Sequence, residues 1–98
     1  MHVAALRVDL HLAHARSLKD KRSVIGPILD GCRQRYSVAA AEVDHQDLRQ
    51  RAELAMATVS GSAGHAARVL DAVERFVWSF PEVEVVSVTR HWLETDEP

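Results

Sequence analysis

The segment Arg16–Arg22, with the sequence RSLKDKR, has the residue types and spacing best suited to binding chemistry. It holds two arginines and the only two lysines of the chain, and it joins a strand-like segment to a helix-like one. The free amide groups and the dipole of a helix's first turn attract phosphate, and nearby cations strengthen that attraction. We therefore predict contact with an anion or a nucleic acid through five residues: Arg16, Ser17, Lys19, Lys21 and Arg22.

A purely structural interpretation of the same segment stays open. Ser17 is a residue type that caps helices, and Asp20 follows it at the three-residue spacing typical of a capped first turn. In that interpretation these two residues begin the helix, and the neighbouring cations are solvated.

Length, charge and composition favour one small cytoplasmic domain over residues 1–98. No apolar run reaches the ~18 residues of a membrane helix, the N-terminus has no signal-peptide pattern, and the single cysteine fits a reducing compartment. The net charge of −2 excludes binding of polyanions by bulk charge, but the charge is unevenly distributed. Residues 1–35 hold seven Lys and Arg against three Asp, whereas residues 82–98 hold one Arg against five acidic residues. Such asymmetry can orient a partner or a neighbouring subunit.

The hydrophobic pattern predicts the elements that position the basic segment. Period-two alternation indicates a strand over residues 3–12. Spacing of i, i+3, i+4 and i+7 from Ile25 to Cys32 indicates an amphipathic helix after Ser17, which Gly26-Pro27 is expected to kink or restart. A second helix over 64–80 is expected to end at Pro81. Further strands are expected at 36–43, 52–60 and 83–93, with a frayed tail at 94–98.

Two strand–helix–strand halves predict an α+β fold of the ferredoxin-like type, with the element order βαββαβ. Its four strands form an antiparallel sheet with the first and third strands at the centre, and both helices lie on one face. The other face is expected to be solvated or covered by another subunit, and its binding of a small ligand stays an open question. It would carry polar side chains: Arg7, Asp9, His11, Ser87, Thr89 and His91. His11 and His91 are expected to meet if the first and fourth strands pair.

The residues needed for the familiar activities of this fold are missing. Acylphosphatases need a catalytic asparagine, and the chain contains none. Metal-carrying relatives need a Cys-x-x-Cys pair, whereas Cys32 is the only cysteine, and the six histidines have no zinc-site spacing. Recognition of single-stranded RNA bases needs aromatic rings on the central strands, and residues 3–12 and 52–60 contain no Phe, Tyr or Trp. We therefore expect a protein that is not an enzyme, with no catalytic residue, metal or cofactor, and any nucleic-acid contact would be to the backbone.

The chain resembles a known family in several short segments. It is similar to the YlxP-like family, a bacterial family of unknown function numbered 503, over about residues 3–93. The resemblance implies a ferredoxin-like fold, no established activity, and gene neighbours that serve transcription elongation, translation initiation and ribosome binding. The segments that carry it are Arg16–Arg22, Ala41-Glu42-Val43, Gln46-Asp47-Leu48 and Gln50-Arg51-Ala52. The chain departs from the family's pattern at Arg49, where tryptophan is common, and at Gly26-Pro27.

Two tryptophans and the sheet edges favour self-association. Trp78 lies off the apolar stripe of the second helix and Trp92 near the end of the fourth strand, so both are predicted interface residues. Exposed edge strands commonly pair with another chain, which favours a homodimer. Together, the basic segment Arg16–Arg22 and the gene neighbours implied by the family resemblance predict an accessory protein whose partner is RNA or a ribosomal particle. The alternatives are an oligomeric protein–protein interaction or regulatory domain, and an unrecognised small-ligand binder or enzyme.

Overall fold

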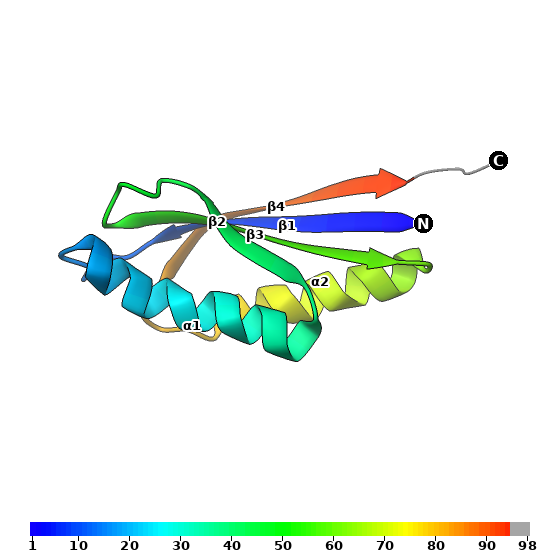
Figure 1. Ribbon diagram of the computed structural model, residues 1–98, viewed down its shortest axis with the longest axis horizontal. Coiled ribbons are helices and arrows are strands. Elements are labelled where there is room, and N and C mark those ends of the chain that lie inside the picture. The colour runs from blue at the N-terminus through cyan, green and yellow to red at the C-terminus, as the bar shows by residue number, and fades with distance from the viewer. Residues whose placement is uncertain (95–98) are drawn as a thin grey trace.

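The computed structural model describes residues 1–94, which form one four-stranded sheet and two helices (Figure 1). The strand order is β2-β3-β1-β4, and all neighbouring strands run antiparallel. Both helices lie on the same side of the sheet, so the predicted ferredoxin-like βαββαβ fold is confirmed. In chain order the elements are β1 (His2–His11), α1 (Leu18–Tyr36), β2 (Ala39–Asp44), β3 (Arg51–Ser60), α2 (Ala63–Trp78) and β4 (Glu84–Glu94).

The core lies between the sheet and the helices. Alternate side chains of β1 are buried, as its period-two pattern predicts, and across the sheet Leu6 lies opposite Met56 and Val8 opposite Leu54. Burial of such side chains contributes roughly 1.5–3 kcal/mol each. The helices add their apolar stripes to this layer: Ile25, Ile28 and Cys32 from α1, and Ala66, Leu70, Val73 and Val77 from α2.

α1 is one continuous helix of 19 residues, so the predicted restart at Gly26-Pro27 is wrong. A residue before proline is normally pushed out of the helical conformation, because its side chain meets the proline ring. Gly26 has no side chain that could meet the proline ring. Apart from the adjacent residues and the helix backbone, no atom lies within 4 Å of the place that a Cβ would occupy at Gly26. The glycine therefore lets the helix continue through Pro27, whose missing N–H leaves one carbonyl without its helical partner.

The largest of the remaining differences from the predicted bounds lies between α1 and β2, and α2 ends at Trp78 instead of residue 80. The last residue of α1 is Tyr36, and the C-cap Ser37 takes a left-handed conformation with φ of 54°. β2 therefore begins at Ala39 instead of residue 36. Glu94 belongs to β4, and the rest of the predicted frayed tail, residues 95–98, lies outside the described residues. Of the two described helices, neither combines the length and the apolar character needed to cross a membrane.

We predict that Pro27→Ala stabilises the protein. Alanine restores a backbone donor in the middle of α1 at an exposed position, so the free energy of unfolding should rise by about 1–3 kcal/mol. Gly26→Ala should lower it when Pro27 is present but raise it by up to about 1 kcal/mol in the Pro27→Ala background. Urea titrations of the unmodified protein and the three variants measure these changes. A stability loss in Pro27→Ala would show that packing of α1 requires the proline.

Candidate functional site

The junction between β1 and α1 is a capped helix start. Ser17 Oγ accepts a hydrogen bond from the Asp20 backbone N–H at 3.0 Å, and Asp20 Oδ2 accepts one from the Arg16 backbone N–H at 2.9 Å. The structural interpretation of Ser17 and Asp20 therefore holds. Because the Asp20 carboxylate already lies at the positive end of the helix dipole, the helix terminus attracts a second anion less strongly.

Four exposed cations lie at this end of the molecule, where the loop before α1 contacts the β2–β3 loop. Arg16 precedes α1, Lys19 and Arg22 lie in the first turns of α1, and Arg49 comes from the β2–β3 loop. Gln50 joins the loops, because its side-chain amide donates to the carbonyls of Ala13 and Ala15 at 3.3 Å. Within residues 1–94, none of the four makes an ion pair. We call Arg16, Lys19, Arg22 and Arg49 the basic end.

Arg49 was not among the predicted contacts. The strand topology alone could have predicted that Arg49 lies beside the β1–α1 junction. β3 begins beside the end of β1, since Arg51 lies opposite His11. The loop before β3 must therefore lie next to the loop after β1.

Lys21 does not belong to the basic end, and its prediction as an anion contact is corrected. Its side chain is only 1% exposed, and its Nζ lies 2.8 Å from Glu42 Oε2. The same Nζ donates to the backbone carbonyls of His45 at 2.8 Å, Gln46 at 3.2 Å and Arg51 at 3.3 Å. Four protein oxygens thus occupy the places where an external anion would have to bind. The spacing of Lys21 to Ile25, Ile28 and Cys32 matches the buried stripe and could have revealed this orientation.

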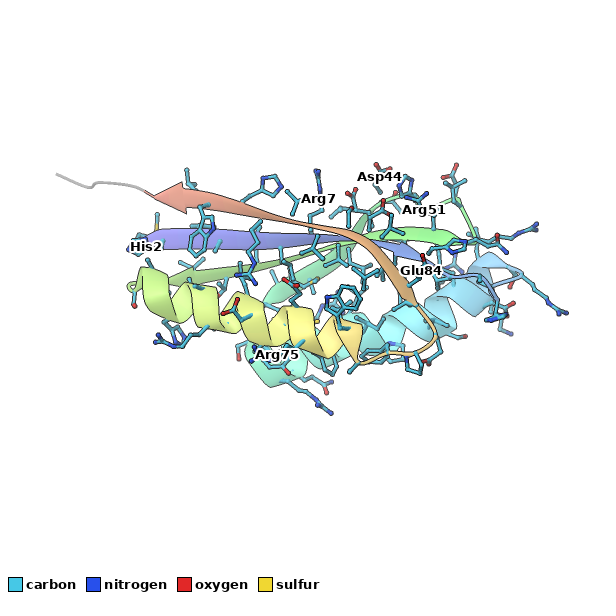
Figure 2. All side chains as sticks on the ribbon, turned by 180° about the vertical axis from the view of Figure 1, so that it is seen from behind. His2, Arg7, Asp44, Arg51, Arg75 and Glu84 are labelled. Carbon is cyan, nitrogen blue, oxygen red and sulfur yellow. The ribbon has the colours of Figure 1, made fainter. Side chains whose placement is uncertain are left out.

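The open face of the sheet carries cross-strand ion pairs instead of a free cluster. Figure 2 shows Arg7, Asp44 and Arg51 on the side of the sheet away from the helices. Arg7 Nε lies 3.0 Å from Glu53 Oε1, and Arg51 pairs with Asp9.

The two histidines of the open face do not meet, although β1 and β4 do pair. His91 lies opposite Ala5 in the register, whereas His11 lies opposite Glu84, with 3.8 Å between His11 Nδ1 and Glu84 Oε2. Among residues 1–94 no three His, Cys, Asp or Glu side chains gather as a metal site would require.

The side of the molecule formed by β4 and α2 exposes both tryptophans. Trp78 is 58% exposed and Trp92 44% exposed, and Trp92 is on the helix-facing side of β4 because it lies opposite the buried Ala4. Between them, Arg90 donates to Asp71 at 2.7 Å and to Glu74 at 3.2 Å. Although burial acts to lower the pKa of Arg90, these hydrogen bonds and charges raise it above its usual value. We call Trp78, Arg90 and Trp92 the tryptophan flank.

A shallow depression of about 180 Å³ opens on the tryptophan flank, lined by Asp71, Glu74, Arg75, Trp78 and Arg90. Tryptophan and arginine dominate the energetic centres of protein–protein interfaces. The composition of this flank is therefore typical of a protein contact.

Cys32 is a core residue of α1. Its side chain is fully buried, and burial raises the pKa of the thiol to about 11, against a smaller lowering effect of Arg33. The thiol stays protonated at neutral pH and is out of contact with solvent, as expected of a structural cysteine.

We predict that Lys21→Met destabilises the protein by about 3–5 kcal/mol, because it leaves the Glu42 carboxylate and three carbonyls without their donor. The double variant Lys21→Met/Glu42→Leu should lose less stability than the sum of the losses in the two single variants. Removing both charges of a buried ion pair costs less than removing one and leaving the other unpaired. Chemical denaturation measures the cycle, and hydrogen exchange should show lost protection around residues 45–51. Unchanged stability and protection in Lys21→Met would show that the β2–β3 loop closes without Lys21.

Comparison with known proteins gives the chain's family. Residues 3–90 match the family described as "Protein of unknown function (DUF503)". The chain is similar to the "Uncharacterized protein YlxP" of Bacillus subtilis (strain 168), with 36% identity over 78 residues that span 80% of this chain and 85% of the relative.

Among solved structures, a de novo designed protein with a ferredoxin fold, determined by solution NMR, superposes with a TM-score of 0.53. The superposition covers 97% of this chain and 88% of the designed one at 11% identity, so it supports the fold alone. The family match spans both loops of the basic end and most of β4, and the chain belongs to this YlxP-like family of proteins of unknown function, DUF503.

Proposed function

We propose that the protein is a non-catalytic cytoplasmic accessory factor that contacts the RNA backbone, free or in a ribosomal particle, through the basic end. The observation that carries this proposal is the set of exposed cations, Arg16, Lys19, Arg22 and Arg49, none of which makes an ion pair within residues 1–94. Cations without a protein partner can replace the counterions of a phosphate backbone, which drives nucleic-acid binding. The gene neighbours that the family resemblance implies point to the same partner.

The contact is to phosphates and not to bases. The open faces of the central strands carry ion pairs such as Arg7–Glu53 and Arg51–Asp9, and β1 and β3 contain no Phe, Tyr or Trp on which a base could stack. Binding should therefore depend little on sequence and strongly on salt.

Acidic residues limit the contact to one side of this end. The α2–β4 connection reaches the same end, because Glu84 lies opposite His11 and Glu82 shares a depression with Asp20. Like charges repel the phosphate backbone, so we expect modest affinity at low salt that is lost at moderate salt.

We predict that replacing Arg16, Lys19 and Arg22 together by Gln weakens binding to ribosomal subunits and to unstructured RNA. For single strands the slope of log K against log salt should become shallower by about 2 units, or about 0.7 per lost phosphate contact. Co-sedimentation with ribosomal subunits and fluorescence anisotropy with RNA, over a series of salt concentrations, measure the effect.

The control removes the same charge elsewhere. Replacing Arg35, Arg68 and Arg75 by Gln also removes three exposed cations, from helix positions outside the basic end. Because Arg75 lines the depression on the tryptophan flank, the oligomeric state of this variant is measured as well. This variant should keep nearly all of the salt dependence. Equal losses in both variants would reduce the effect to net charge, and absence of binding by the unmodified protein at low salt would refute the proposal.

We propose as a second candidate that the protein acts as an oligomeric interaction module, as a dimer. The tryptophan flank supports this proposal, because two tryptophans more than 40% exposed lie on one side of a small domain. Surface tryptophans grouped in this way are typical of contact sites.

We predict that Trp78→Ser and Trp92→Ser each weaken the dimer, by about 2 kcal/mol or about 30-fold in the dissociation constant. Sedimentation equilibrium over a concentration series measures the dissociation constant. Leu48→Ser is the matched control, since Leu48 is 46% exposed in the β2–β3 loop and not on this flank. A monomer at every concentration, or an equal effect of Leu48→Ser, would contradict the second candidate.

A further inference from the structure

The two edges of the sheet differ in how well they are protected from pairing. β2 has six residues and a register shift between Glu42 and Asp44, and short, bulged strands resist pairing with another chain. β4 has eleven residues, and its irregularity lies near its start, where Ser87 faces Asp9 but Val85 faces Leu10. The stretch 87–94 is regular and contains neither lysine nor proline, the residue types that commonly protect an edge.

The helix-facing side of β4 is covered only in part, because Val85 and Val88 pack against the core but Trp92 is 44% exposed. α2 packs against β1 and β3, and Figure 2 views the molecule from the side where β4 lies in front of the other strands. Arg90 and Trp92 therefore project beside α2 and not beneath it, which explains the exposure of Trp92. A long, regular edge and an exposed tryptophan therefore occur on the same strand, and Arg90 is its only cation within 87–94.

We propose that the β4 edge pairs antiparallel with the β4 edge of a second copy of this chain, about a two-fold axis at His91. This inference rests on the self-association proposed above and specifies how it occurs. The two sheets would join into one sheet of eight strands, with all helices on the same side. The two α2 helices would then be about 19 Å apart, four strand spacings, with the tryptophan flanks of both copies between them.

The charges and the bulge of β4 favour this register over its neighbours. An axis at Arg90 would place two arginines directly opposite each other, which is destabilising. With a two-fold axis at Thr89, or at a residue before it, the strand pairing between the two copies would include Val86, the position at which the pairing of β4 with β1 is irregular. With an axis at Trp92, only residues 90–94 of the two copies could pair.

An axis at His91 pairs residues 88–94 with one another and avoids these costs. It places each Arg90 opposite Trp92 of the second copy, so both guanidinium groups face an indole. Asp71 and Glu74 hold each guanidinium in place, which leaves its planar face available for stacking. The register is therefore self-complementary, as a two-fold contact requires.

The experiment is thiol cross-linking of His91→Cys in the full chain. Cysteines opposite each other at the axis have Cα atoms about 4.5–5.5 Å apart, within the range of a disulfide. His91 is exposed on the open face, opposite the small side chain of Ala5, so the substitution leaves the core intact. Native Cys32 does not interfere, because it is buried and its pKa is raised.

Thr89→Cys is the matched control, because Thr89 is exposed on the same face of β4 only two residues away. In the proposed register its two copies would be about 14 Å apart, too far for a disulfide. We expect His91→Cys to form a disulfide-linked dimer under mild oxidation at least about tenfold faster than Thr89→Cys.

Each alternative result overturns a defined part of the inference. Faster cross-linking of Thr89→Cys would replace the register by one centred on Thr89. A dimer by sedimentation in which neither cysteine cross-links would overturn edge pairing and leave the second candidate function standing. A monomer at every concentration would overturn both.

Discussion

The ammonium group of Lys21 is the buried charge on which one end of this molecule depends. It joins three parts of the chain, because α1 supplies the lysine, β2 supplies Glu42, and the β2–β3 loop supplies carbonyls of His45 and Gln46. An ammonium in the interior costs several kcal/mol unless oxygens replace its water, so the first turn of α1 can pack only with the loop closed over it. The loop in turn carries Arg49 and Gln50, and Gln50 is bonded to the β1–α1 junction. The position of Arg49 beside the β1–α1 junction thus depends on one cation that is not exposed.

A second constraint is that two helices cover a four-stranded sheet incompletely. Of the four strands, α1 packs mainly against β2, and α2 packs against β1 and β3. β4 is therefore the strand with the least helix cover, although Val85 and Val88 reach the core. The ion pairs of Arg90 with Asp71 and Glu74 are the main polar link from β4 back to α2. The basic end and the tryptophan flank therefore have separate physical origins, which is why the two proposed functions can be tested independently.

The sequence was sufficient for the architecture but not for the site. The alternation of β1 and the stripe of α2 are set by burial, which hydrophobic patterns report directly. Lys21 was misassigned because its residue type was given more weight than its spacing to Ile25 and Ile28. Continuation of α1 through Pro27 depends on the missing side chain of Gly26. Helix preferences of single residues do not include this effect, because it arises from the two residues together. The separation of His11 from His91 depends on the register of β1 and β4, which the sequence pattern leaves open.

The burial of Lys21 also determines how the protein responds to amine-directed reagents. The chain has only two lysines, and the reactive nitrogen of Lys21 is enclosed by four oxygens. Lys19 is therefore the one lysine side chain that an acylating reagent can reach while the protein is folded. A dye, a surface or an acetyl group attached to a lysine would be placed at a single known position, within the basic end. Modification of Lys21 would report that the β2–β3 loop had opened.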